Sequence, residues 1–328
     1  MKKMDIVAQY LERFPDLPSL TLARKIYNDE PNAFPTLDAA RSSVRRMRGA
    51  IGGVERGNVS DRRFLRDLQK PYNPYGLPVS DEKEFAPVII PPGNSQLLVL
   101  SDVHIPFHSV AALTAVIEWG LKKDIKGILL NGDILDFYQL SRFEKDPRSR
   151  SFADELQMAE EFIETLRHAF PGAPIWYKEG NHELRWERFL KTKAPELLDC
   201  DDFRLDVLLK CGQYGVQYVR EKRVIKAGRL SIVHGHEFFG GSGGVNPARW
   251  LFLRSGANAM CGHFHKTSEH TEPDIDGNLQ ACWSTGCLSE LHPDYAALNK
   301  WNQGFARIVF DEDRFRVDNI RIDNGKVL

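Results

Sequence analysis

Apolar and polar positions change their spacing along this chain, and each change predicts a different element. From residue 96 onward, short and mainly apolar runs recur at residues 97–100, 127–130, 174–178, 230–233 and 257–260. Between the first three runs lie two segments with apolar positions at helical spacing, residues 110–123 and 152–170. Apolar strands that alternate with helices predict an α/β fold with a parallel β-α-β-α-β core covered on both faces.

The first 70 residues follow another pattern, which predicts three short helices at residues 4–14, 19–28 and 36–49. The third helix has an apolar stripe made of Leu37, Ala40, Val44 and Met47. A second stripe, turned away from the first, consists of Arg41, Arg45 and Arg48. This segment, residues 1–70, resembles a helix-turn-helix unit with a basic exposed helix. Residues 71–95 follow with six prolines, which predicts an extended linker.

Charge is distributed unevenly, although the formal net charge is only −1. Residues 1–70 carry 14 Lys and Arg against 9 Asp and Glu, whereas the remainder carries 30 against 36. An arginine stripe on a basic segment can follow a nucleic-acid backbone, so nucleic acid is a candidate partner of Arg41, Arg45 and Arg48. The alternatives are a solvated face or a surface that docks on the acidic remainder of the chain.

The bulk composition is that of an ordinary globular protein, with 328 residues of which 42% are hydrophobic. No apolar stretch approaches the roughly 20 residues of a membrane helix, and the N-terminus lacks the apolar region of a secretory signal. We therefore expect a cytoplasmic protein without a membrane partner. Five cysteines without a CxxC pair predict reduced thiols rather than a disulfide framework or a zinc ribbon. The oligomeric state is left open.

Five short motifs follow the apolar runs and carry the candidate chemistry. They are Asp102-Val103-His104, Gly132-Asp133-Ile134-Leu135-Asp136, Gly180-Asn181-His182-Glu183, His234-Gly235-His236 and Gly262-His263-Phe264-His265. Carboxylates, imidazoles and a carboxamide at the carboxyl ends of strands can bind a closely spaced pair of divalent metals. The motifs therefore predict metal-dependent hydrolysis of a phosphate ester. The alternative is a set of buried histidines and turn aspartates without a metal.

The set DxH, GDxxD, GNHE, HGH and GHxH, in this order over residues 96–310, resembles the calcineurin-like metallophosphoesterase superfamily. The resemblance implies a two-sheet α/β sandwich with a dinuclear centre over residues 96–328. It implies that the ligands of the first metal are Asp102, His104 and His265. It implies that the ligands of the second metal are Asn181, His234 and His263, with Asp133 as the bridging carboxylate.

The residue types explain what such a centre does. Two aspartates cancel part of the charge of two divalent cations, and a surplus of about two positive charges remains to attract phosphate and hydroxide. A hydroxide that bridges the metals is the expected nucleophile, since metals lower the pKa of bound water toward neutrality. Mixed nitrogen and oxygen ligands without thiolate suit Mn²⁺, which we expect, or Fe, Zn²⁺ or Ni²⁺.

Two further residues complete the expected catalytic machinery. The resemblance implies that His182 donates a proton to the departing alkoxide and that Asp136 holds it in place. Asn181 and Arg185 are candidate substrate contacts, because the planar guanidinium of Arg185 can reach a phosphate oxygen. The alternative for Arg185 is a surface salt bridge to Glu183 or Glu187.

Three functions remain open at this point. The first is a phosphodiesterase or nuclease acting on nucleic acid or a nucleotide, because a basic helical segment precedes the metal motifs. The second is a phosphomonoesterase acting on a phosphoprotein or a small metabolite. GNHE occurs in serine/threonine protein phosphatases, but their GDxxDRG block reads GDILDFY here, with Phe137 and Tyr138 in place of Arg-Gly. These aromatics either hold a planar group or pack in the core. The third is a nucleic-acid-binding or assembly protein with a vestigial metal site.

Overall fold

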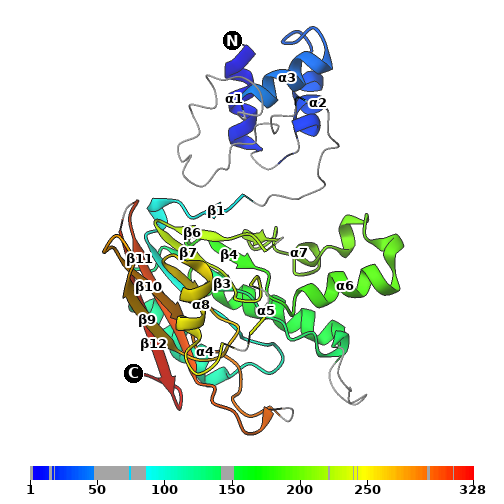
Figure 1. Cartoon of the computed structure of the whole chain (residues 1–328). Coiled ribbons are helices and arrows are strands. Elements are labelled where there is room, and N and C mark those ends of the chain that lie inside the picture. The colour runs from blue at the N-terminus through cyan, green and yellow to red at the C-terminus, as the bar shows by residue number, and fades with distance from the viewer. Residues whose placement is uncertain are drawn as a thin grey trace. The chain divides into compact units, whose positions relative to one another are not determined.

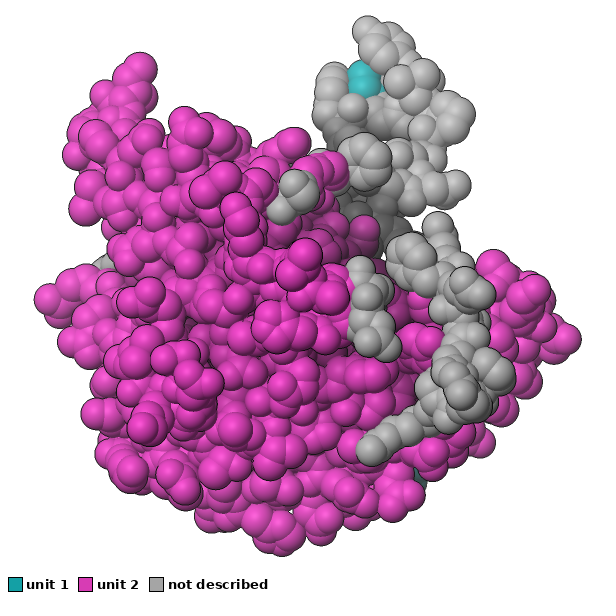
Figure 2. Space-filling model, turned by 90° about the horizontal axis from the view of Figure 1, so that it is seen from below, with its two compact units in different colours: residues 1–80 teal, residues 81–328 magenta. Residues whose placement is uncertain are grey.

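The computed structural model describes residues 3–14, 17, 19–47, 74, 86–141, 151–220, 222–238, 240, 241, 243–293, 296–312 and 314–328. The chain divides into two compact units, residues 1–80 and 81–328 (Figure 2). Within the described ranges, no helix has both the length and the apolar character needed to cross a membrane.

The described residues of the first unit form three helices, α1 (Lys3–Arg13), α2 (Ser19–Asp29) and α3 (Leu37–Met47), which confirms the predicted helical segment (Figure 1). The N-terminus of α3 is capped by Thr36, whose hydroxyl accepts a hydrogen bond from the Ala39 N–H at 3.1 Å. The helices share a small core of Ile6, Val7, Leu22, Ala23, Ile26, Phe34, Ala40 and Val44. Arg41 and Arg45 are exposed on α3, whereas Arg48 lies outside the described residues.

The second unit contains a seven-stranded sheet in the order β13-β12-β11-β2-β3-β4-β5. Four neighbouring strands are parallel, β2 (Gln96–Leu100), β3 (Gly127–Asn131), β4 (Ile175–Lys178) and β5 (Val216–Val219). Antiparallel pairing extends the sheet through β11 (Gln303–Phe310), β12 (Phe315–Asp323) and β13 (Lys326–Val327). The parallel strands are the predicted ones, together with β5.

A second sheet has six strands in the order β1-β6-β7-β8-β10-β9. Its strands are β1 (Val88–Ile89), β6 (Ile225–Ala227), β7 (Leu230–Ile232), β8 (Ala259–Cys261), β9 (Ser268–Pro273) and β10 (Leu279–Ser284). Strand β1 lies within the segment that was expected to be a linker. It is paired with β6, because the N–H groups of Val88 and Ile90 donate to the carbonyls of Val224 and Lys226. The last part of that segment is therefore paired in a sheet.

Alternating side chains of the parallel strands explain how the layers pack. Leu98, Leu100, Ile128 and Leu130 share a core with residues of α4 (Val110–Leu121) and α5 (Phe152–Ala169). Their neighbours Leu97, Val99, Leu129 and Trp176 pack instead against β6, β7, β8 and β10. Helices thus cover one face and the second sheet covers the other, which confirms the two-sheet sandwich. The remaining helices are α6 (Leu184–Lys193), α7 (Leu205–Leu208) and α8 (Pro247–Ser255), with 3-10 turns η3 (Pro92–Asn94), η4 (Tyr138–Leu140), η5 (Pro195–Leu197) and η6 (Asp201–Phe203).

Candidate metal centre

The five motifs meet because both sheets present strand ends at one place. The first three motifs follow β2, β3 and β4, which are adjacent and parallel, so their carboxyl ends share one edge. The other two follow β7 and β8, which are parallel neighbours in the second sheet. Candidate ligands that are far apart in sequence therefore come from both layers of the sandwich.

Three groups of potential metal-binding atoms form there, each with its atoms within 4.8 Å of one another. They are Asp102 with His104 and His265, Asp133 with His234 and His263, and His104 with Asp133 and His182. Asp133 belongs to two groups, which is the position that a bridging carboxylate requires. Asn181 adjoins them, because the N–H of the next residue, His182, donates to Asp133 Oδ1 at 2.9 Å.

Hydrogen bonds on the far sides of two rings orient them toward the centre. His234 Nδ1 lies 2.7 Å from the Asn131 carbonyl oxygen, to which it must donate, so its Nε2 faces Asp133 Oδ2 at 3.2 Å. His104 Nδ1 lies 3.1 Å from Asp136 Oδ1, and its Nε2 lies 3.1 Å from His265 Nε2. Histidines that bind metals are held in this way by a carboxylate or carbonyl on the other nitrogen.

The electrostatics of the centre follow from buried carboxylates. Burial opposes ionisation of Asp102, but its hydrogen bond with His265 and the nearby charges lower its pKa to about 2. Burial alone would lower the pKa of His234, yet the charge of Asp133 raises it to about 10. Burial and the charge of His234 lower the pKa of His263 to about 4.

The residues fit a pair of divalent cations. Asn181 Oδ1 and His263 Nδ1 are buried and have no hydrogen-bond partner, an arrangement that costs about 1–3 kcal/mol for each polar group unless a ligand satisfies it. Asp102 and Asp133 are 0% and 2% exposed, and carboxylates buried so deeply are usually paired with a positive charge or bound to a metal. Carboxylate, carbonyl and imidazole ligands without thiolate suit Mn²⁺, Zn²⁺ and related ions.

Backbone strain is concentrated in the same residues. Positive φ angles occur at Asp102 (56°), His104 (52°), Asp133 (52°), His263 (68°) and His265 (56°). Non-glycine residues in this region cost about 1–3 kcal/mol each and persist where surrounding contacts impose them. Such strain is typical of functional sites, so it supports a functional interpretation of the cluster.

Glycines in the motifs allow the loops to approach one another. Gly132 has φ of 85°, and a Cβ there would lie 2.5 Å from His234 Nδ1. A Cβ on Gly180 would collide with the carboxylate and backbone nitrogen of Asp133. Larger residues at either position would separate Asp133 from the ligands next to it.

His182 contacts both the carbonyl and the carboxylate of Asp136. Its Nδ1 lies 2.8 Å from the Asp136 carbonyl oxygen and 3.2 Å from Oδ1. Arg185 donates from Nη2 to His182 Nε2 at 3.0 Å and from Nη1 to the Asp136 carbonyl at 2.7 Å. Because an arginine can only donate, Nε2 accepts and Nδ1 carries the hydrogen in this arrangement. Burial lowers the pKa of His182, but the charges of Asp133 and Asp136 raise it above its ordinary value.

Arg185 does not form the salt bridge to Glu183 or Glu187 that was the alternative from the sequence. Glu187 pairs with Lys191 at 2.7 Å, and Glu183 is occupied by backbone donors. Arg185 is bonded to His182 and Asp136 instead, so it is part of the site.

The two aromatics after GDxxD have separate environments. Phe137 is fully buried and stacks on Phe152 with a centroid distance of 5.4 Å, so it packs in the core. Tyr138 lies 6.0 Å from the ring of Phe107, which is 40% exposed.

Sequence reasoning missed the carboxylates that hold the loops. Glu183 is 2% exposed and accepts hydrogen bonds from Tyr177 Oη and from the N–H groups of Gly180, Asp133, Ile134 and Leu135. It therefore ties the GDxxD loop to the GNHE loop. Glu237 has a similar position behind the HGH motif, where it accepts from the N–H groups of His234 and Gly235. The sequence signals were the glutamate that ends the GNHE motif and the glutamate directly after HGH.

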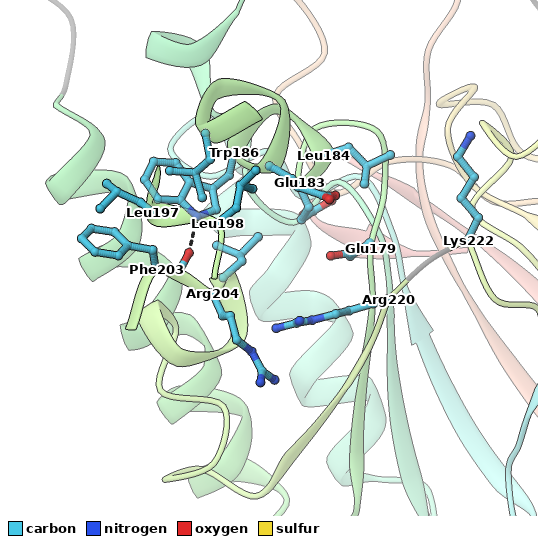
Figure 3. A pocket seen from close by; sticks show the side chains of 13 residues that line it. Glu179, Glu183, Leu184, Trp186, Leu197, Leu198, Phe203, Arg204, Arg220 and Lys222 are labelled. Carbon is cyan, nitrogen blue, oxygen red and sulfur yellow. Dashed lines mark hydrogen bonds between the residues drawn. The ribbon is translucent and has the colours of Figure 1, made fainter. Parts of the chain in front are cut away.

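A cavity of about 510 Å³ lies beside Glu183, on the side of α6 (Figure 3). Its walls include Trp186, whose Nε1 donates to the Phe203 carbonyl at 2.7 Å. Arg204 and Arg220 also line it, and both form ion pairs with Asp206. The cavity is therefore mainly apolar, with its arginines partly neutralised.

Comparisons with known proteins agree with the motifs. Residues 95–267 match the sequence profile described as calcineurin-like phosphoesterase. The gene 54 protein of Mycobacterium phage L5 is 28% identical over 252 residues, which cover 71% of this chain and 96% of that protein. Among solved structures, vacuolar protein sorting 29 from Cryptosporidium parvum is 14% identical with a TM-score of 0.40, covering 71% of this chain and 94% of that one. Yfce, a phosphoesterase from E. coli, is 15% identical with a TM-score of 0.31, covering 68% and 98%.

Proposed function

Because this chain belongs to the calcineurin-like phosphoesterase family, and is thus a metal-dependent phosphoric ester hydrolase, we propose that its substrate is a phosphodiester of nucleic acid or of a nucleotide. The observation that carries the catalytic part is the convergence of potential metal-binding groups around Asp133. The observation that favours nucleic acid is the exposed arginine pair on α3. Residues 1–70 then act as a nucleic-acid-binding segment, joined through residues 71–95, of which Val88–Ile89 already pair in the second sheet, to the catalytic domain of residues 96–328.

The proposed ligands are supported by the groups of potential metal-binding atoms described above and by Asn181 beside them. One cation would be held by Asp102, His104 and His265, and the other by Asn181, His234 and His263, with Asp133 available to both. When bound, the cations, most suitably Mn²⁺, neutralise the phosphoryl oxygens and lower the pKa of water so that hydroxide is available as the nucleophile. The chain itself orients His234 through the Asn131 carbonyl and His104 through Asp136, and it buries the aspartates that balance the charge.

His182 is the proposed proton donor to the leaving oxygen. Asp136 holds its Nδ1, which leaves Nε2 to carry the proton that the departing alkoxide needs. In the arrangement described, Nε2 accepts from Arg185, so the guanidinium must turn away before Nε2 can donate. A phosphate oxygen is a suitable new partner for Arg185, and Asn181 next to His182 is a second substrate contact.

The class of ester is tested with the full chain, Mn²⁺ and two chromogenic substrates. We expect release of p-nitrophenol from bis-p-nitrophenyl phosphate, and a much lower rate with p-nitrophenyl phosphate. Activity restricted to the monoester would contradict the diester proposal and favour a phosphomonoesterase. Binding of DNA or RNA without metal-dependent activity on either compound would favour a vestigial centre. No second function is proposed, since Phe137 packs in the core where the protein phosphatase block has an arginine.

Replacing Arg41 and Arg45 together by glutamine should weaken binding to duplex or single-stranded nucleic acid. Each exposed arginine that neutralises a phosphate releases counterions from the nucleic acid. The logarithm of the binding constant therefore depends less steeply on the logarithm of the salt concentration in the variant, and the magnitude of this slope should decrease by about 1 per arginine. Fluorescence anisotropy with labelled oligonucleotides at several salt concentrations measures this slope. Arg24 is exposed on α2, and Arg24→Gln is the control. An unchanged slope in the double variant would contradict the proposal that α3 binds nucleic acid.

A further inference from the structure

Lys178 and Glu237 form a buried ion pair that touches none of the proposed ligand atoms. The side chains are 1% and 11% exposed, and Lys178 Nζ lies 2.8 Å from Glu237 Oε1. Lys178 Nζ also donates to the Arg223 carbonyl oxygen at 2.7 Å. The two residues come from different layers of the sandwich, because Lys178 is the last residue of β4 and Glu237 lies in the turn after β7.

Glu237 holds the backbone of the segment that carries His234. Its Oε1 accepts from the His234 N–H at 2.9 Å, and its Oε2 accepts from the Gly235 N–H at 2.7 Å. Both carboxylate oxygens are thus bonded to this turn, and Lys178 fixes the carboxylate from the other side. A displacement of Glu237 would move the backbone of His234 directly.

Asn131, which lies beside Lys178 at the end of β3, makes a second contact with residues 233–237. Asn131 and Lys178 are register partners at the ends of β3 and β4. Asn131 donates from Nδ2 to the Val233 carbonyl at 2.9 Å and accepts from His234 Nδ1 through its own carbonyl. Two residues before them, Leu129 and Trp176 pack against the second sheet. The apolar contact between the sheets therefore ends in polar contacts, and apart from the Lys178 bond to the Arg223 carbonyl these reach residues 233–237.

Stability alone is a weak reason for such a pair. Burying two charges costs desolvation free energy, and apolar replacements of buried pairs are often neutral or stabilising. Residues behind a metal ligand, in contrast, commonly change metal affinity or activity 10–100-fold when they are mutated. The pair is therefore better explained by what it positions.

We propose that Lys178 and Glu237 are positioning residues that fix His234 relative to Asp133 and thereby set the affinity of the second metal site. The inference rests on the proposed function in one respect, namely that His234 is a metal ligand. It assigns a role in metal binding to Lys178 of β4, which lies outside all five motifs. The contribution is mechanical, because the hydrogen bonds of both side chains go to each other and to backbone groups rather than to a proposed ligand atom.

The test measures Mn²⁺ binding to the full chain by calorimetry and by electron paramagnetic resonance. The double variant Lys178→Met/Glu237→Gln keeps the side-chain shapes and leaves no unpaired buried charge. We expect one of two Mn²⁺ sites to lose affinity by about 10–100-fold while the other is unchanged, with a melting temperature close to that of the wild type. Arg307→Met/Asp318→Asn is the matched control, since that partly buried pair joins β11 to β12.

Two equal sites with wild-type affinity in the double variant would overturn the proposal. If that variant does not fold, Glu237→Asp replaces it, because the shorter carboxylate keeps the charge but cannot span Lys178 and both N–H groups. Wild-type affinity in Glu237→Asp would overturn the proposal equally. A wild-type chain that binds two Mn²⁺ but hydrolyses no ester would remove the proposed function and leave this inference standing.

Discussion

Asp133→Asn is expected to reduce hydrolysis of bis-p-nitrophenyl phosphate by at least about a thousandfold, which corresponds to roughly 4 kcal/mol of lost transition-state stabilisation. Asp133 takes part in two of the three groups of potential metal-binding atoms, so its carboxylate is the proposed link between both cations. Asparagine removes the negative charge and places an N–H₂ group where two lone pairs are required. Both cations should therefore bind more weakly.

The result is checked by steady-state kinetics together with the metal content of the purified chain. The variant should fold, because Asn Oδ1 can still accept from the His182 N–H that is bonded to Asp133 Oδ1 at 2.9 Å. Asp276→Asn, in the exposed turn between β9 and β10, controls for the loss of one charge elsewhere. Wild-type turnover with two bound metals in Asp133→Asn would exclude the bridging role.

His182→Ala is expected to reduce turnover of a dinucleotide by about 10²–10⁴-fold, because the alkoxide that leaves would lack a proton donor. The reduction should be much smaller for bis-p-nitrophenyl phosphate, since nitrophenolate leaves without a proton. Metal content should stay at the wild-type value, because His104 and Asp133 keep other contacts in the centre. The comparison of leaving groups separates proton donation from metal binding.

The measurement is kcat for both substrates in the wild type and in His182→Ala. His168→Ala, exposed on α5, is the control for loss of an imidazole. An equal loss on both substrates would argue against a proton donor and for a contact with the phosphoryl group. A loss of bound metal would instead place His182 among the ligands, as its group with His104 and Asp133 allows.

The elements could be predicted because their patterns are local. Leu97 to Leu100 is apolar throughout, and the structure shows why, since alternate residues face the helices and the second sheet. The helices of the first unit followed from the spacing of residues such as Ala40 and Val44, which are buried. Strand β1 could not be predicted, because Val88 and Ile89 pair with residues distant in the chain.

In the candidate site, too, some features could be predicted from local sequence and others depend on contacts between distant residues. The motifs placed Asp102, Asp133 and His182 at strand ends, and parallel neighbouring strands bring such ends together. The Asp136 partner of Arg185 could not be read from the chain, because the Asp136 carbonyl lies 49 residues away and reaches the guanidinium only after β3 and β4 have paired, whereas His182 is a local neighbour. The same holds for Phe137, whose burial depends on contact with Phe152.

The sequence by itself thus determined the family, the two-sheet α/β class and the residue types available for metal chemistry, since these depend on local spacing and on motifs in order. Only the tertiary structure decided which groups hold those residues: Glu183 between two loops, and Lys178 with Glu237 across the two sheets. The physical reason is that a buried carboxylate accepts hydrogen bonds from nearby donors that have no other partner. Which donors lie near it, and which of them lack a partner, is decided only when the sheets pack.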